Sequence, residues 1–104
     1  MSIVSIYVVF ADADEAERIG RIVVDERLAA CINVLAPVRS IYRWQGKVET
    51  ADEVAAILKT TRGGADALIA RIAALHSYEV PCVALWPIDK AFEPYARWVE
   101  DNSG

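Results

Sequence analysis

The chain has 104 residues, of which 55% are hydrophobic and 25% charged, with only five Gly and four Pro. This length and composition are typical of one folded domain, and they exclude a disordered chain, a collagen and a low-complexity linker. Fifteen acidic and eleven basic residues give a formal net charge of −4, and the basic residues are scattered. A nucleic-acid binder needs clustered positive charge. We therefore expect one domain over residues 1–104 and no nucleic-acid partner.

The sequence shows no segment of the kinds that direct a chain into or across a membrane. No apolar run approaches the roughly 18 residues that a membrane span needs. The first residues have neither the basic region nor the small-residue cleavage site of a signal peptide. Cys31 and Cys82 form no CxxC pattern, so we expect buried free thiols rather than a disulfide. These observations predict a cytoplasmic protein with no membrane partner.

The first two elements are indicated by residue type and spacing. Residues 3–10 are rich in β-branched and aromatic side chains, which predicts a strand covered on at least one face. Asp12 is followed three residues later by Glu15, a pattern typical of a helix N-terminus. Apolar residues then recur at helical spacing and predict an amphipathic helix that ends near Leu28.

A long hairpin is predicted next. Residues 31–44 alternate between apolar and polar, which favours a strand with Pro37 at a bulge or an edge position. The Gln-Gly pair at 45–46 supplies a turn. A second strand returns over residues 47–61, and its least regular part is residues 50–53.

Three shorter elements complete the chain. The glycine pair at 63–64 breaks the strand, and apolar residues at 68–75 recur at helical spacing. Pro81 separates this helix from an apolar run at 82–86, which we expect to be a buried strand, and Pro94 is suited to the first turn of a closing helix. The order of elements is that of an α+β, ferredoxin-like βαββαβ sandwich with an extra C-terminal helix.

The hairpin indicates an oligomer. A strand of fourteen residues spans roughly 45 Å, whereas a compact chain of this size has a radius of gyration of about 13 Å. The hairpin must therefore project past the core or bend around it, which would expose Tyr42, Trp44 and unpaired strand edges. Since exposed aromatic residues and free edges are normally covered, we expect a homo-oligomer with Tyr42 and Trp44 as oligomer contacts.

Five segments carry a family resemblance: ERLAACIN at 26–33, SIYRWQGK at 40–47, LKTT at 58–61, HSYEVP at 76–81 and YARW at 95–98. In this order, over nearly the whole chain, they resemble the CutA divalent-cation-tolerance family. The resemblance implies a ferredoxin-like subunit in a tight homotrimer, with hairpins that pair between subunits. It also implies a role in tolerance to divalent metals, copper above all, and copper binding. Some family members carry cysteine where this chain has Phe10 and Arg71, so Cys31 is the one cysteine at a matching position.

The metal-ligand candidates are Cys31 and the single histidine, His76. Thiolate and imidazole are the side chains that copper prefers, often with carboxylates in the divalent state. The alternatives are a structural buried thiol for Cys31 and a helix-ending residue for His76. Without a CxxC or HxxxH pattern, spacing alone favours no obligatory cofactor, and copper or another divalent cation is the ligand that the resemblance implies.

A pocket is a second hypothesis. His76 could belong to a cleft that Tyr78 and Glu79 also line. Lys59 lies on a predicted strand, where it is either solvated, paired at an interface, or a pocket lysine for an anionic group beside Glu49 or Glu79. The alternative function is therefore a trimeric signalling protein that binds a small anion or a nucleotide in clefts between subunits.

An enzyme is the third hypothesis. A cysteine and a histidine can act as nucleophile and base when they lie within hydrogen-bond distance. The sequence has neither a glycine-rich phosphate loop nor a nucleophile elbow to accompany them. We expect a binding module and not an enzyme.

Overall fold

The structure is a computed structural model that describes residues 2–104. The elements are β1 (Ile3–Phe10), α1 (Ala13–Asp25), β2 (Cys31–Trp44), β3 (Lys47–Thr61), α2 (Ala65–Leu75), β4 (Val83–Pro87) and α3 (Glu93–Asn102). The four strands form one antiparallel sheet in the order β2-β3-β1-β4. This is the strand order of the ferredoxin-like sandwich, so the predicted α+β βαββαβ fold with an extra C-terminal helix is confirmed.

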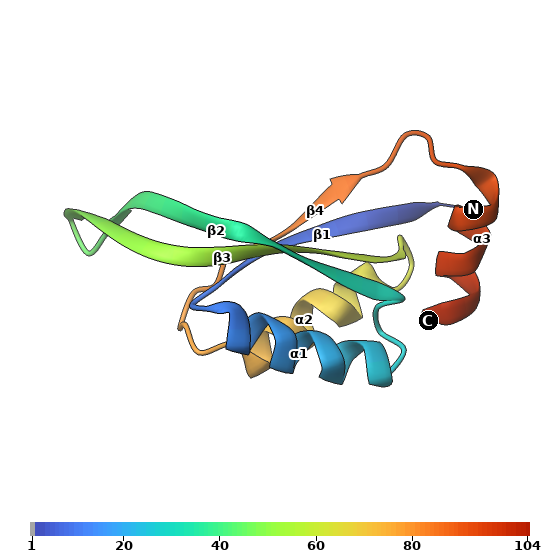
Figure 1. The fold of residues 1–104 in the computed structure, drawn as a ribbon, viewed down its shortest axis with the longest axis horizontal. Helices are drawn as coiled ribbons and strands as arrows, with labels where there is room; N and C mark the ends of the chain where they lie inside the picture. Colours follow the sequence, from blue (N-terminus) through green and yellow to red (C-terminus); the bar gives the residue numbers. More distant parts are fainter. Residues whose placement is uncertain (1) are drawn as a thin grey trace.

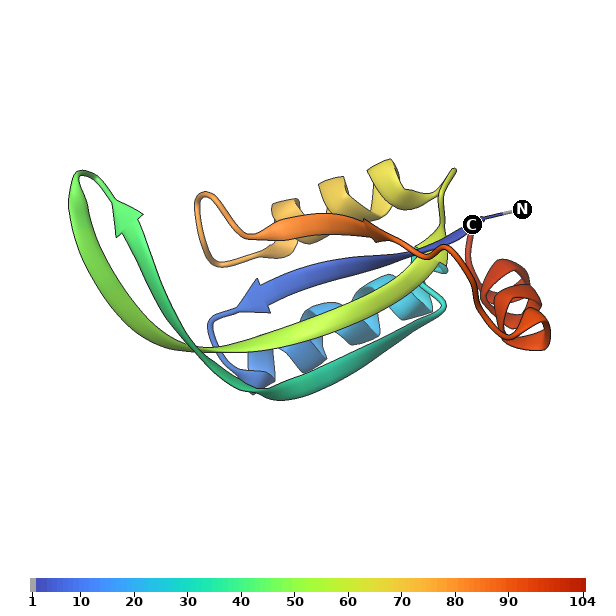
Figure 2. The same ribbon diagram turned by 90° about the horizontal axis from the view of Figure 1, so that it is seen from above.

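The sheet has one covered face and one largely open face. Helices α1 and α2 lie against the same face, while α3 lies at the end of the sheet where β1 begins (Figures 1 and 2). Side chains of β1 that point towards α1 and α2 are buried, including Ile6 and Phe10. On the other face Tyr7 stacks on Trp86 with ring centroids 4.6 Å apart, and Trp86 remains 47% exposed. The strand expected at 82–86 is present as β4, but it is not buried as expected, because it is an edge strand with an open face.

Helix α1 begins where the sequence predicts and ends earlier. The Asp12 carboxylate accepts a hydrogen bond of 2.8 Å from the Glu15 backbone N–H and caps the first turn. The helix ends at Asp25 rather than near Leu28, because Arg27 adopts a left-handed conformation with φ of 63°. The Arg27 guanidinium donates to the Asp101 carbonyl and its own carbonyl accepts from the Gly104 N–H, each at 2.7 Å.

The hairpin of β2 and β3 extends beyond the other strands and curves (Figure 2). Its register shifts between Val34 and Pro37, which confirms the predicted bulge. Strand β3 continues through residues 50–53, and the turn has positive φ at Gln45 and Gly46, as two-residue hairpins require. The longest dimension is 44 Å and the radius of gyration is 14.0 Å, so the hairpin projects as expected.

The two cysteines differ from the expectation of buried thiols. Both are free; Cys31 is half-buried and Cys82 is exposed. Both lie away from the face that α1 and α2 cover: Cys31 contacts Tyr95 of α3, and Cys82 lies just before β4. Among residues 2–104, no helix combines the length and the apolar character required to cross a membrane.

A substitution at Leu58 can test how tightly the face of the sheet under α1 and α2 is packed. It is fully buried and pairs in register with Ile6 and Ile32. Substitution Leu58→Ala should lower the free energy of unfolding by about 2–5 kcal/mol, since it removes buried methyl groups and leaves a cavity. Urea unfolding at fixed protein concentration measures this loss. The control Phe92→Ala, at a side chain 77% exposed, should change it by no more than about 0.5 kcal/mol. Equal effects of the two substitutions would contradict this packing.

Candidate functional site

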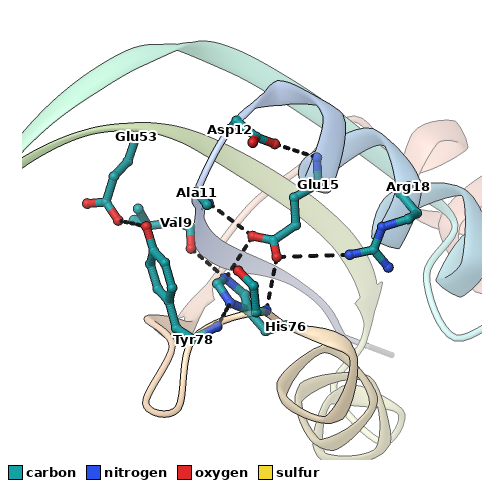
Figure 3. A network of polar contacts seen from close by, with 9 residues as sticks. Val9, Ala11, Asp12, Glu15, Arg18, Glu53, His76 and Tyr78 are labelled. Carbon is teal, nitrogen blue, oxygen red and sulfur yellow. Dashed lines mark hydrogen bonds and ion pairs between the residues drawn. The ribbon is translucent and has the colours of Figure 1, made fainter.

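His76 is the centre of a buried polar network at the corner between β1, α1 and the loop after α2 (Figure 3). Its side chain is 0% exposed and stacks on Phe10. Nδ1 accepts a hydrogen bond of 3.0 Å from the Tyr78 backbone N–H. Because that N–H can only donate, the ring proton lies on Nε2, which donates to the Val9 carbonyl at 2.8 Å. Both ring nitrogens are thus engaged, and a metal at His76 would have to displace one of these bonds.

Glu15 joins the residues before α1 to the loop after α2. Its carboxylate accepts hydrogen bonds from the backbone N–H groups of Ala11 at 3.0 Å and Ser77 at 2.9 Å, and it lies 3.7 Å from His76 Nε2. Burial alone would raise the pKa of Glu15, but the hydrogen bonds from Ser77 and Ala11 outweigh it and the pKa is lowered. The sequence indicated Glu15 only as a residue of the first helical turn.

Tyr78 and Glu53 form the outer part of the network. The Tyr78 hydroxyl donates to the Glu53 carboxylate at 2.6 Å (Figure 3). Burial and this hydrogen bond raise the pKa of Tyr78 above its ordinary range, so the phenol keeps its proton. Glu53 is only 7% exposed, although it lies on the projecting hairpin. Sequence reasoning missed Glu53; the available signal was a carboxylate directly before the apolar run at residues 54–58.

A cleft of about 830 Å³ lies between the hairpin and the loop that precedes β4. Tyr78 and Glu79, two of the predicted pocket residues, line it. The predicted oligomer contacts Tyr42 and Trp44 line it as well, and they are 41% and 40% exposed. Its other walls include Tyr7, Val9, Arg43, Glu53 and Cys82. Burial and the Glu53 carboxylate raise the pKa of the Cys82 thiol.

Cys31 and Lys59 lie elsewhere, at the opposite end of the open face. They pair with each other in register, and Lys59 also pairs with Ser5 of β1. The Cys31 Sγ atom lies 3.6 Å from the Tyr95 hydroxyl. Burial and the contact with Cys31 raise the pKa of Tyr95 to about 12.

The carboxylates expected beside Lys59 lie far from it, one near the hairpin turn and the other at the cleft. Glu49 pairs with Tyr42 near the turn, ten residues along β3 from Lys59, and Glu79 lines the cleft. Such a separation corresponds to roughly 33 Å along a strand. Lys59 therefore does not share a pocket with Glu49 or Glu79 within one chain.

Cys31 and His76 are not brought together either. Cys31 lies level with Ser5, whereas His76 bonds to Val9, four residues further along β1. Among residues 2–104, no group of three or more His, Cys, Asp and Glu side chains could hold a metal ion. Within the described residues, Cys31 and His76 therefore share no metal site and do not form a nucleophile–base pair.

The strand order and the helices on one face define a ferredoxin-like domain with an extended, curved hairpin (Figure 2). The family model described as "CutA1 divalent ion tolerance protein" matches residues 4–102. The chain belongs to this family.

Relatives and solved structures agree with this membership. The divalent-cation tolerance protein CutA of Archaeoglobus fulgidus is 34% identical over 97 residues, which cover 93% of this chain and 94% of the relative. That of Thermus thermophilus is 40% identical over 89 residues, 86% of each chain. A solved structure of the Thermus thermophilus protein superposes with a TM-score of 0.93 at 35% identity, over 98% of this chain and 99% of the other.

The lowered pKa of Glu15 predicts how stability depends on pH. Because the folded chain holds the carboxylate below its ordinary pKa of 4.5, the stabilisation is present above that pH and is lost as the pH falls through the folded value. Glu15→Gln should therefore lower the urea midpoint at pH 7. The midpoint of this variant should also decrease less than that of wild type when the pH is lowered. Glu17→Gln is the matched control, since the Glu17 side chain is 62% exposed. Parallel pH profiles for wild type and Glu15→Gln would contradict this.

Proposed function

We propose that the chain acts in the tolerance of divalent metal cations, copper above all, as a homotrimeric binding module and not as an enzyme. The observation that carries this proposal is the family match over residues 4–102, which includes the long hairpin. Relatives of similar length are named for divalent-cation tolerance, and this supports a family-level role in metal tolerance. A cytoplasmic location is part of the proposal, although the solved Archaeoglobus fulgidus relative is described as periplasmic and a rice relative as chloroplastic.

The surface of one chain supports the homotrimer. Among residues 2–104, strands β2 and β4 each have one edge that no other strand pairs with. The face away from α1 and α2 exposes Trp86, and the hairpin exposes Ile41 and Val48 by 71% and 64%. Apolar side chains beside free strand edges are usually covered by another chain. Two further copies would cover both edges and the open face.

The homotrimer predicts a mass in solution of three times the 11.4 kDa chain. Light scattering coupled to size exclusion measures it. The double substitution Tyr42→Ala and Trp44→Ala should lower the mass at micromolar concentration, because it removes aromatic area from the hairpin. Phe92→Ala, which removes an exposed aromatic residue directly before α3, should leave the mass unchanged. A wild-type monomer at micromolar concentration would refute the trimer.

In this proposal copper is held by donors from more than one chain, since the donors of one chain do not converge. Cys31 is the first candidate ligand, because it is a partly accessible soft thiol on the open face that assembly would cover. His76 is the second candidate, and binding there requires release of the Tyr78 N–H or the Val9 carbonyl.

Competition titration with Cu(I) and Cu(II) against a chelator of known affinity tests the metal role. Wild type should bind stoichiometrically, and Cys31→Ser should weaken binding by about tenfold or more, since it removes the soft donor. His76→Gln should weaken copper binding only if the imidazole gives up its bond to the Val9 carbonyl or to the Tyr78 N–H when the metal binds. Cys82→Ser is the matched thiol control, and the mass of each variant is measured alongside. Weak binding that is equal in all four proteins would exclude direct copper coordination by these residues.

The second candidate function is binding of a small anion or nucleotide between subunits. The observation that favours it is Lys59, which is half-buried on the open face and belongs to no ion pair of residues 2–104. Titration with inorganic phosphate and with ATP distinguishes this function from the first. Saturable binding that is lost in Lys59→Gln and kept in Cys31→Ser would favour it over the metal role.

A further inference from the structure

The chain contains two asparagines, which differ in the residue that follows them. Asn102 precedes Ser103, whereas Asn33 precedes the β-branched Val34. Asparagine is chemically labile, because the backbone nitrogen of the next residue can attack its side-chain amide carbon. A small next residue leaves that nitrogen open, and a β-branched one obstructs it. Asn33 is also held within β2, opposite Ile57 of β3. Asn102 is therefore the asparagine whose neighbour permits the attack.

The end of α3 differs from the ends of α1 and α2. In those two helices, the residue after the helix donates its backbone N–H to the carbonyl four residues earlier, at 2.9 Å in both. After α3 it is the hydroxyl of Ser103 that makes the close bond to the corresponding carbonyl, that of Val99, at 2.6 Å. Ser103 is extended, with φ of −140° and ψ of 155°, so the helix stops at Asn102. The hydroxyl thus competes for the acceptor that would otherwise hold the Ser103 backbone nitrogen.

The Asn102 amide is held by one bond at the surface. Its Nδ2 donates to the Trp98 carbonyl at 2.8 Å, and water competes for such an exposed bond. Ser103, by contrast, is only 5% exposed. Its nitrogen therefore reaches the Asn102 side chain when the last turn of α3 opens, and helix ends open more readily than helix interiors.

Arg27 opposes this opening on both sides of Asn102. Its guanidinium donates to the carbonyl of Asp101, the residue before the asparagine, at 2.7 Å. Its own carbonyl accepts from the N–H of Gly104, two residues after the asparagine, also at 2.7 Å. Opening of the last turn has to break these bonds. The contacts of Arg27 therefore govern how often the attack can occur.

We propose that Asn102 is a site of spontaneous deamidation and that Arg27 controls its rate. The backbone nitrogen of Ser103 forms a bond to Cγ of Asn102, the Cγ–Nδ2 bond breaks, and the amide group leaves as ammonia with the proton from the Ser103 nitrogen. Water then opens the cyclic imide at either of its two carbonyls, which gives aspartate or isoaspartate. The only co-reactant is water, and the inference is independent of the metal role.

The product differs from the original chain in charge and in backbone length. It adds a negative charge directly after Glu100 and Asp101, at the end of a helix where the dipole disfavours negative charge. Isoaspartate also inserts a methylene group into the main chain between Asn102 and Ser103. Both changes act against the bonds that Arg27 makes, so the modified chain should hold this segment less firmly.

Peptide mass spectrometry of the full chain, folded and incubated in mildly alkaline buffer, tests the site. The tryptic peptide 98–104 should gain the mass difference between an amide and a carboxyl group, mostly as isoaspartate. The peptide 28–39, which carries Asn33, is the internal control and should stay unmodified over the same time. The modified protein, separated by anion exchange, should have a lower thermal midpoint than the unmodified protein.

Variants test the role of Arg27. Arg27→Gly keeps the left-handed turn, which glycine adopts freely, and removes the guanidinium. It should speed deamidation of Asn102 by about fivefold, the factor expected for the loss of one hydrogen bond. Arg21→Ala is the matched control, since Arg21 is an exposed arginine of α1 that pairs with Glu17, and the rate should not change. If Arg27→Gly fails to fold, Ser103→Val replaces it and should slow the reaction, because the β-branched side chain obstructs the nitrogen.

Three results would overturn the proposal. The first is that Asn102 in wild type stays intact or deamidates no faster than Asn33. The second is that Arg27→Gly and Arg21→Ala deamidate at equal rates, or that Ser103→Val deamidates as fast as wild type. The third is that the modified and unmodified proteins have equal thermal midpoints.

Discussion

Strand β1 ends well before the hairpin turn, and the geometry of the polar network and of the cleft depends on this difference in strand length. Strand β1 pairs with β3 only as far as Phe10 and Val54, and β3 continues from there to the turn with β2 as its single partner. The sheet therefore changes from four strands to two at this point. Glu53 is the first residue of β3 beyond the pairing with β1, and the loop that carries His76 and Tyr78 fills the corner that β1 leaves open (Figure 3). The site exists because the strands have unequal lengths.

Burial of polar groups at this corner is tolerated because backbone groups compensate it. His76 uses the carbonyl of Val9 and the N–H of Tyr78, and Glu15 uses the N–H groups of Ala11 and Ser77. Among residues 2–104, every buried side-chain nitrogen or oxygen has a hydrogen-bond partner. Such a network holds the loop after α2 against the start of α1, and so fixes one wall of the cleft. The imidazole acts in this geometry as a structural connector between elements, which explains its position better than metal ligation within one chain.

Most of the fold was predictable because local signals and the global arrangement agree. Strand and helix spacing, the Asp12 cap, the Gln-Gly turn and the bulge before Pro37 are local features, and each is where the sequence predicts it. The end of α1 was not predictable, because a left-handed arginine gives no sequence signal. The polar corner was not predictable either. Its partners are separated by 25 residues for Tyr78 and Glu53 and by 67 for His76 and Val9, and spacing carries no information on such contacts.

The bonds of Arg27 join the last residues of the chain to the turn between α1 and β2. A left-handed conformation costs a non-glycine residue about 1–2 kcal/mol, and here bonds to Asp101 and Gly104 help to hold it. The C-terminal residues therefore hold the turn between α1 and β2 in place, and Arg27 in that turn is four residues before Cys31. Removal of residues 103 and 104 would delete no member of the two hydrophobic clusters, yet it would remove the Gly104 bond that holds this corner. The start of β2, with its thiol, would then gain freedom of movement that the intact chain denies it.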